Sequence, residues 1–472
     1  MKNDRPIVQA LKKFVANEPL SLHVPGHKNG LLSQLPTDIK RALIYDVTEL
    51  TGLDDFHHPE EVILEAEQLL AKTYGANRSF FLVNGSTVGN LAMIYATCKQ
   101  GDTVLVQRNA HKSIFHALQL VGVKPVYIAP KWHEQSETAG CIELATLKQA
   151  VARYSHAKAA IFTYPSYYGV TAQDFQQQIA ICHEANIPVL VDEAHGAHLT
   201  VTEQLPASAL DLGADVVVQS AHKTLPAMTM ASFMHVKSQR VSADKLNHYL
   251  RMLQSSSPSY LLLASLDDAR DYVANYTESD FVYLMDKRKQ FIESLTASTQ
   301  LQVVEVDDNL KLLVRAPGYT GFELKGALEK MHVYVELADA KQVLLILPLL
   351  KHGDSYPFAD LRIRMKEAMI HLKDQPSKEL EQRTNFEMMS ITTPEYSFAE
   401  IEAATKEWVP YMRAIGRVAA STIIPYPPGI PLFVPGEKIT VAKLSQLEEL
   451  LAIGATFQGE HRLLEKLIYV IK

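Results

Sequence analysis

The chain contains few cysteines and lacks long apolar runs. Its three cysteines, Cys98, Cys141 and Cys182, are scattered through 472 residues without the spacing of metal ligands. That pattern excludes a disulfide framework and suits a reducing compartment. No apolar run approaches the roughly 18 residues of a membrane-spanning helix. The start, MKNDRPIVQALKKF, also lacks the apolar core of a secretory signal. We therefore expect a cytoplasmic protein without a membrane partner.

An excess of positive charge is also missing. The chain has 46 Lys and Arg against 53 Asp and Glu, a net charge of -7. Nucleic-acid-binding domains usually carry clustered positive charge, so we expect no nucleic-acid partner, and the balance weakly favours a cationic small molecule. With 47% hydrophobic and 21% charged residues the composition is globular, and 472 residues are too many for one core.

Two site types are disfavoured because parts of them are missing. The stretch LVDEAH at 190–195 resembles the magnesium-binding box of some helicases, but the phosphate loop that those enzymes need upstream does not occur in the chain. His195 and His198 have a spacing that could bind a metal, yet no third ligand is nearby. We expect no metal.

Short apolar runs alternate with helical patterns over much of the chain. Such alternation is typical of an α/β fold with a mainly parallel sheet flanked by helices, whose ligands bind beyond the carboxyl ends of the strands. Helical patterns also cover 6–16 and 62–74, and a smaller α+β layer is expected after 270. The expected strands of the sheet are 79–83, 103–106, 125–129, 159–162, 188–192 and 215–219.

Lys223 follows the last of these strands by only a few residues. A lone lysine is usually a solvated surface residue, because lysine is rarely buried unless it is paired. Here Ser220 and His222 are beside it and could bind a phosphate. Together with the motifs upstream, this favours a Schiff-base lysine in a pyridoxal phosphate (PLP) site.

Asp192 ends another expected strand, PVLVD. A buried carboxylate is costly unless a cation meets it, and a protonated pyridine nitrogen would serve. After the first strand, Gly85, Ser86 and Thr87 open a helix where free N–H groups and hydroxyls could cradle a phosphate, although an ordinary helix cap is equally consistent. His111 starts a further helix and could stack on an aromatic ring, or it is simply a satisfied polar residue.

Six motifs stand in order along the chain: HVPGHK (23–28), NGST (84–87), RNAHKS (108–113), VDEAHGAH (191–198), SAHKTLPA (220–227) and YPPGIPLFVPGE (426–437). Together they resemble the PLP-dependent ornithine, lysine and arginine decarboxylases. The resemblance runs from about residue 20 to the C-terminus. It implies fold type I of the PLP-dependent transferases. We expect an N-terminal arm (1–55), a PLP-binding major domain (56–270) and a C-terminal small domain (271–472) with a Pro-rich loop at 425–437.

The resemblance also implies roles for individual residues. Lys223 would bind PLP covalently, Asp192 would pair with the pyridine nitrogen, and His111 would stack over the ring. His195 would lie close to the cofactor as a further catalytic residue. The phosphate would be held by Gly85, Ser86, Thr87, Ser220 and His222.

Residues for the substrate are less sharply indicated. Asp54, Asp55 and Glu437 could pair with a cationic side chain, but Asp54 also suits the start of a helix and Glu437 a solvated loop end. His27 and Lys28 could contact an anion or lie in a solvated loop. The implied reaction is decarboxylation of lysine, ornithine or arginine to the amine, in polyamine-related metabolism. Alternatives are an aminotransferase or aldolase of the same fold, or a silent binding homologue, against which the intact Lys223, Asp192 and His111 argue.

The chain departs from the family pattern in three places. Met230 stands where members commonly have Gln, and Ser166 where they often have Thr. HVPGHK arrives at residue 23, which leaves no room for the wing domain of larger relatives. The chain therefore resembles the short form, for which we expect a homodimer or a dimer-based tetramer.

Overall fold

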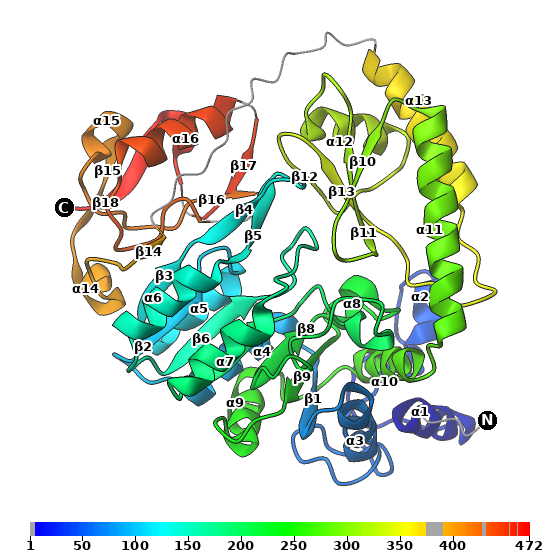
Figure 1. Cartoon of the computed structure of the whole chain (residues 1–472). Coiled ribbons are helices and arrows are strands. Elements are labelled where there is room, and N and C mark those ends of the chain that lie inside the picture. Colours follow the sequence, from blue (N-terminus) through cyan, green and yellow to red (C-terminus); the bar gives the residue numbers. More distant parts are fainter. Residues whose placement is uncertain (1–4, 374–389, 427–430, 453, 460) are drawn as a thin grey trace. The chain divides into compact units, whose positions relative to one another are not determined.

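A computed structural model describes residues 5–373, 390–426, 431–452, 454–459 and 461–472 (Figure 1). The chain divides into two compact units. The first comprises Met1–Thr97 and Pro188–Thr277, and the second comprises Cys98–Ile187 and Glu278–Lys472. Among the described residues, no helix is both long enough and apolar enough to cross a bilayer.

The first unit contains four strands in the order β1-β9-β8-β7. Strand β8 runs parallel to β7, and β9 is antiparallel to both β8 and β1. Nearly every residue of these strands is buried, as their Val, Leu and Phe content predicts. The strands are β1 (Arg78–Leu82), β7 (Val189–Asp192), β8 (Val216–Gln219) and β9 (Ser232–Val236).

Helices cover these strands, and a glycine lets one of them approach closely. In α4 (Gly85–Thr97), a Cβ on Gly89 would come within 2.7 Å of Val218 and 2.8 Å of Leu82. Only glycine permits this packing, so the start of α4 lies directly against β8 and β1. The other helices of the unit are α1 (Pro6–Ala16), α2 (Thr37–Ala42), α3 (Val62–Tyr74), η1 (Leu199–Val201), α8 (Ala221–Thr224), α9 (Ala243–Leu253) and α10 (Tyr260–Ala274).

The second unit contains three parallel strands in the order β6-β2-β3, with β14 antiparallel at the edge of β3. A hairpin, β4 and β5, follows β3. The elements are β2 (Thr103–Gln107), α5 (Lys112–Val121), β3 (Lys124–Ile128), β4 (Pro130–His133), β5 (Thr138–Ile142), α6 (Leu144–Arg153), β6 (Ala159–Thr163), α7 (Phe175–Glu184) and β14 (Ile391–Thr392).

An α+β layer in the same unit packs its own hydrophobic core. Its antiparallel sheet has the order β10-β11-β13-β12, and its helices bury residues such as Leu324, Met365 and Leu372 against it. The elements are α11 (Glu278–Ser298), β10 (Gln302–Glu305), β11 (Lys311–Arg315), α12 (Gly321–Lys330), β12 (Leu337–Ala338), β13 (Val343–Ile346) and α13 (Phe358–Lys373).

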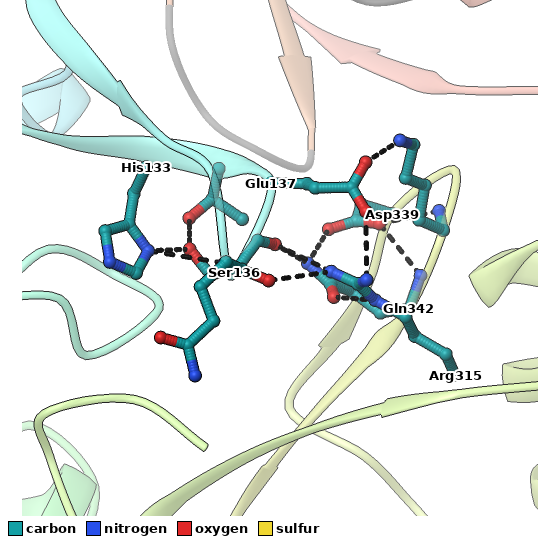
Figure 2. A network of polar contacts seen from close by, with 9 residues as sticks. His133, Ser136, Glu137, Arg315, Asp339 and Gln342 are labelled. Carbon is teal, nitrogen blue, oxygen red and sulfur yellow. Dashed lines mark hydrogen bonds and ion pairs between the residues drawn. The ribbon is translucent and has the colours of Figure 1, made fainter. Parts of the chain in front are cut away.

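The turn of the β4–β5 hairpin is bonded to this layer (Figure 2). Arg315 donates to the Glu137 carboxylate at 2.9 Å and to the Ser136 carbonyl at 3.1 Å. The buried Gln342 donates to the same carbonyl at 2.8 Å and accepts from Arg315 at 2.9 Å. Asp339 accepts from the backbone N–H groups of Lys341 and Gln342. These contacts satisfy a turn that would otherwise bury unpaired backbone groups.

The chain after 390 forms two further antiparallel pairs, β15 with β18 and β16 with β17. Residues 427–430 of the expected Pro-rich loop lie outside the described residues. The elements are α14 (Phe398–Ala403), β15 (Lys406–Pro410), α15 (Tyr411–Ala414), β16 (Ile424–Tyr426), α16 (Val441–Ala452), β17 (Thr456–Gln458), η2 (Leu463–Glu465) and β18 (Leu467–Ile471).

Most expected elements are found close to their predicted bounds. The helices at 6–16 and 62–74 are confirmed, as are the six strands. Sequence patterning missed β9, which makes part of the sheet antiparallel, and it also missed β4, β5 and β14. The expected domain boundaries at 55 and 270 stay predictions.

Candidate active site

Lys223 lies in the first unit, on the short helix α8 that directly follows β8. Its side chain is half-buried, and its Nζ is 2.9 Å from Nε2 of His195. His195 is only 4% exposed and lies in the turn after β7. Because β7 and β8 are adjacent and parallel, their carboxyl ends bring these two side chains together.

Asp192 is the last residue of β7 and is 2% exposed. Its Oδ2 accepts a hydrogen bond of 2.9 Å from Nδ2 of Asn90, and its Oδ1 accepts one of 3.2 Å from the Ala194 N–H. These two partners within the described residues are neutral. Within the described part of the chain, the carboxylate is therefore oriented by an amide and a backbone N–H group.

The start of α4 lies next to the start of α8. Gly85 has φ +77°, a conformation that side chains disfavour, and it allows the turn from β1 into α4. Ser220, which is fully buried, donates through Oγ to Oγ of Ser86 at 2.9 Å. Thr87 is exposed, and His222 donates through Nδ1 to the Ala231 carbonyl at 3.0 Å. Two hydroxyls and the first turn of a helix thus gather where an anion can be held.

A buried polar chain supports these strand ends. Glu193 accepts from Gln219 Nε2 at 2.7 Å, and Gln219 accepts from His235 Nε2 at 3.1 Å. His235 Nδ1 lies 2.8 Å from Oγ of Ser79. Burial raises the pKa of Glu193 to about 8, despite hydrogen bonds from Ala209, Gln219 and Ser208, and it lowers the pKa of His235 to about 3. This hydrogen-bonded network joins β7, β8, β9 and β1 next to Asp192 and Ser220.

His111 belongs to the second unit, where it caps α5. Its Nδ1 accepts from the Ser113 N–H at 3.3 Å and lies 2.8 Å from the Ser113 hydroxyl. The ring orientation is thus fixed by its own helix. The predicted stacking role stays a prediction.

Asp54 accepts hydrogen bonds from five backbone N–H groups, those of Asp55, Glu60, Glu61, Ile63 and Leu64, at 2.8–3.4 Å. Burial acts to raise the pKa of this carboxyl, but these backbone bonds outweigh burial and lower it. Asp54 therefore caps the entry to α3, as the helix-start alternative proposed. Asp55 accepts from the N–H groups of His57 and His58. Substrate roles for both acids stay predictions.

Glu437 is 4% exposed and is not the solvated loop end that one alternative expected. It accepts from Arg108, Thr392 and Lys443, all in the second unit. His27 bonds Asp46 at 3.0 Å through Nε2 and accepts from the Gly30 N–H through Nδ1. Lys28 donates to the His23 carbonyl at 2.6 Å. Their substrate roles likewise stay predictions.

Met230 and Ser166, the two residues that depart from the family pattern, have distinct surroundings. Met230 is 44% exposed and has φ +79°, which is unusual for a residue with a side chain. Ser166 is buried, and its hydroxyl accepts from the Val170 N–H at 3.1 Å, which closes the loop after β6. Within the described ranges, no cluster of three or more His, Cys, Asp or Glu side chains is arranged to hold a metal ion.

Asn90, Glu193 and Gln219 were not singled out by sequence. Each is a polar residue at the end of an apolar strand or inside an apolar helix, and each is fully buried. A buried polar residue in such a run needs a partner, and that was the available signal.

Comparison with known proteins shows to which family the chain belongs. Residues 5–312 match the profile of the major domain of the Orn/Lys/Arg decarboxylases, and residues 377–460 match the profile of their C-terminal domain. The chain is 43% identical to the uncharacterized protein YaaO of Bacillus subtilis over 98% of both chains. It is 32% identical to the arginine decarboxylase of the same organism, over 100% of this chain and 98% of the relative.

Among solved structures, the lysine decarboxylase LdcF of Francisella novicida superposes with a TM-score of 0.78. That match covers 99% of this chain and 81% of the other, at 20% sequence identity. The likeness confirms the expected α/β fold, fold type I of the PLP-dependent transferases. From these profiles and relatives, the chain belongs to the Orn/Lys/Arg decarboxylase family and is an amino-acid decarboxylase by descent.

Proposed function

We propose that this protein decarboxylates a basic amino acid with PLP as its cofactor, and that arginine is its preferred substrate. The preference is supported by the 32% identity of the chain to an arginine decarboxylase, which extends over its whole length. Ornithine and lysine are the competing substrates.

The observation that supports the cofactor most directly is the buried Asp192 carboxylate, whose partners within the described residues are neutral. Keeping a buried carboxylate ionised is costly, and a cation beside it offsets that cost. The protonated pyridine nitrogen of PLP supplies one, so the residues fit the group. The Lys223 amine and the hydroxyls of Ser86 and Ser220 belong to the same unit.

In this proposal Lys223 attaches the cofactor covalently and His111 packs on its ring. Gly85, Ser86, Thr87, Ser220 and His222 hold its phosphate. When bound, PLP supplies an electron sink for the pair left on the α carbon as carbon dioxide departs. The side chains of the protein orient the reacting groups and transfer the protons.

Asp192 keeps the ring nitrogen protonated, and Asn90 holds the carboxylate in one orientation. Lys223 Nζ and His195 Nε2 are within hydrogen-bond distance, so they can share one proton. That pair can accept a proton from the incoming substrate amine and is a source of the proton that the α carbon requires after carbon dioxide has left. The buried network of Glu193, Gln219, His235 and Ser79 limits the movement of the ends of β7 and β8.

The distal guanidinium or ammonium of the substrate needs an acid. Asp54, Asp55 and Glu437 are the candidates from sequence, with His27 and Lys28 for an anionic group. The carboxylates of Asp54 and Glu437 already accept several hydrogen bonds, so Asp55, which is exposed, is the most available of the three. Sites of this fold type resemble clefts at a dimer interface. We infer a cytoplasmic homodimer, or a dimer-based tetramer, that supplies amines to polyamine metabolism.

The test is to incubate the purified protein and PLP separately with arginine, lysine, ornithine and uncharged norleucine. We expect release of carbon dioxide and the matching amine, with the highest kcat/KM for arginine. Formation of a keto acid without carbon dioxide would instead identify an aminotransferase. Sedimentation at the assay concentration tests the dimer, and a fully active monomer would contradict it.

A further inference from the structure

The connection between β2 and α5 carries His111 and is tightly folded. It begins at Arg108, whose N–H donates to the Ile128 carbonyl at 2.8 Å. The Ala110 N–H then donates back to the Gln107 carbonyl at 3.2 Å. Only Asn109 and Ala110 lie between Arg108 and His111, so whatever fixes Arg108 also limits where the imidazole can lie.

Arg108 is held by a buried carboxylate from the C-terminal part of the second unit. Its Nη2 donates to Glu437 Oε2 at 2.6 Å, and both side chains are at most 5% exposed. Thr392 donates to Glu437 Oε1 at 3.0 Å. Lys443 donates to Oε2 at 2.8 Å. The guanidinium also lies over the Tyr127 ring, 5.6 Å from its centroid.

The charges make this cluster sensitive to the loss of either partner. Two cations, Arg108 and Lys443, share one carboxylate, so removing Glu437 would leave the buried Arg108 and the partly buried Lys443 as like charges without their shared anion. Lys443 stands in the first turn of α16, where the helix dipole disfavours a cation, and Glu437 offsets that cost. The cluster thus joins the β2–α5 connection to the segments around Thr392 and Glu437, which are distant in sequence.

Glu437 is itself held in place by its neighbours. Gly436 has φ +88°, and a Cβ there would come within 2.9 Å of the Tyr396 carbonyl oxygen and 2.8 Å of Pro394 Cβ. The Ala419 N–H donates to the Glu437 carbonyl at 2.9 Å. The carboxylate therefore presents a rigid surface to Arg108.

We propose that Arg108 and Glu437 are positioning residues for His111: their buried ion pair fixes the β2–α5 connection and so the orientation of the imidazole. This inference rests on the proposed PLP function, in which His111 packs on the ring of the cofactor. It replaces direct substrate binding as the role of Glu437, since both carboxylate oxygens already accept hydrogen bonds within the unit. The C-terminal segment then acts on the reaction through His111.

The first experiment needs no cofactor. Amide hydrogen exchange in the apo protein should become about tenfold faster at residues 108–113 in Glu437→Gln, the size expected when one member of a network is lost. The matched control is Lys438→Met, which removes the neighbouring but exposed ion pair of Lys438 with Glu395. Unchanged exchange at 108–113 in Glu437→Gln would overturn the proposal.

The second experiment is a double-mutant cycle on PLP affinity, measured from the absorption band of the bound cofactor. Glu437→Gln should weaken binding about tenfold in the wild-type background and less than about twofold in a His111→Ala background, because the two residues act as one unit. Equal effects in both backgrounds would mean that Glu437 acts without His111. The milder Thr392→Val, which removes one hydrogen bond to Glu437, repeats the cycle if Glu437→Gln does not fold.

These outcomes separate this inference from the function itself. If the wild-type protein binds no PLP, the proposed function fails, while the exchange experiment still decides whether Glu437 fixes the connection. If PLP binds and arginine is decarboxylated but the cycle is additive, only the positioning role fails.

Discussion

Asn90 holds the Asp192 carboxylate through a hydrogen bond of 2.9 Å at a position where both side chains are buried. It comes from α4, whereas Asp192 ends β7, so the bond joins a helix to the end of a strand. Gly89, next to Asn90, lets α4 approach the sheet closely enough for this contact. The Asn90 amide can therefore contact Asp192 only because Gly89 lets the helix lie this close to the sheet.

We expect Asn90→Ala to weaken PLP binding by about 10- to 150-fold, since losing a hydrogen bond to a buried charged group costs about 1.5–3 kcal/mol. Absorbance titration of the apo protein with PLP measures this. Asn275→Ala is the matched control, because Asn275 donates to the Asp271 carboxylate at 2.9 Å at an exposed helix end. Equal affinities in the wild type and Asn90→Ala would show that Asp192 does not need this partner.

Lys223 is expected to be the point of covalent attachment. Borohydride reduction of the protein with PLP should add the cofactor mass to the peptide that contains Lys223, and Lys223→Ala should show no such addition. Peptide mass spectrometry reads the result. Lys237→Ala, at an exposed lysine after β9, should behave as the wild type does. Modification of another lysine in Lys223→Ala would move the anchor elsewhere.

The site residues that were predictable from sequence lie at the end of a strand or shortly after it. Lys223, Asp192 and Ser86 interrupt apolar runs, and that position alone indicates the edge of a sheet. The supporting residues could not be inferred in the same way. Asn90 and Gln219 act through partners about 100 and 26 residues away along the chain, Asp192 and Glu193, and sequence spacing does not encode such pairs.

At the scale of single elements, α3 depends on a residue outside it. Asp54 accepts hydrogen bonds from backbone N–H groups in the turn before the helix and in its first residues. Glu61, the residue immediately before α3, makes no capping hydrogen bond with its own side chain. One carboxylate thus satisfies backbone groups that the helix cannot satisfy.

Asp54→Ala should lower the free energy of unfolding by about 2 kcal/mol, the upper end of a lost cap, because several N–H groups lose their acceptor together. Urea denaturation measures the loss. Asp38→Ala, which removes an exposed ion pair with Arg41, should change stability little. Should Asp54→Ala keep full stability but lose its discrimination against norleucine, the substrate role would displace the capping role.

Sequence patterning found the parallel strands and missed β9. The run SFMHV contains a polar histidine, and it follows β8 after the loop that carries Lys223. His235 is tolerated in a buried strand because Ser79 and Gln219 bond both its ring nitrogens. His235 therefore interrupts the apolar run that would have indicated a buried strand. Its partners come from other strands and are near it only in the folded sheet.

At the scale of the whole molecule, two buried acids contribute to the pH dependence of stability. Burial raises the pKa of both Glu67 and Glu193 to about 8, against a usual value of 4.5. Between these values the folded protein binds more protons than the unfolded chain. The contribution of these two acids to the free energy of unfolding therefore falls as the pH rises from about 4.5 to 8. Glu437 acts oppositely: although burial opposes the shift, Arg108 and Lys443 lower its pKa to about 2, so its contribution is lost only as the pH falls from about 4.5 towards 2.

Glu193→Gln should flatten the dependence of unfolding free energy on pH between about 5 and 8, by at most about 1.4 kcal/mol per pH unit. Chemical denaturation at a series of pH values measures the slope. The exposed Glu293→Gln serves as the control. An unchanged slope would mean that Glu193 is ionised in the folded protein throughout this range.

The antiparallel strand β9 has a consequence for how the protein is made. Arg78 of β1 pairs with Val236 of β9, so β1 has no partner on that side until about 160 more residues have left the ribosome. At about 5–20 residues per second, the exposed edge of β1 waits between roughly 8 and 30 seconds. During that interval the nascent chain offers an apolar, unpaired strand to any other chain nearby. Correct assembly of the first unit is therefore a matter of timing during translation, and chaperones that shield strand edges are expected to bind nascent chains that end before residue 232.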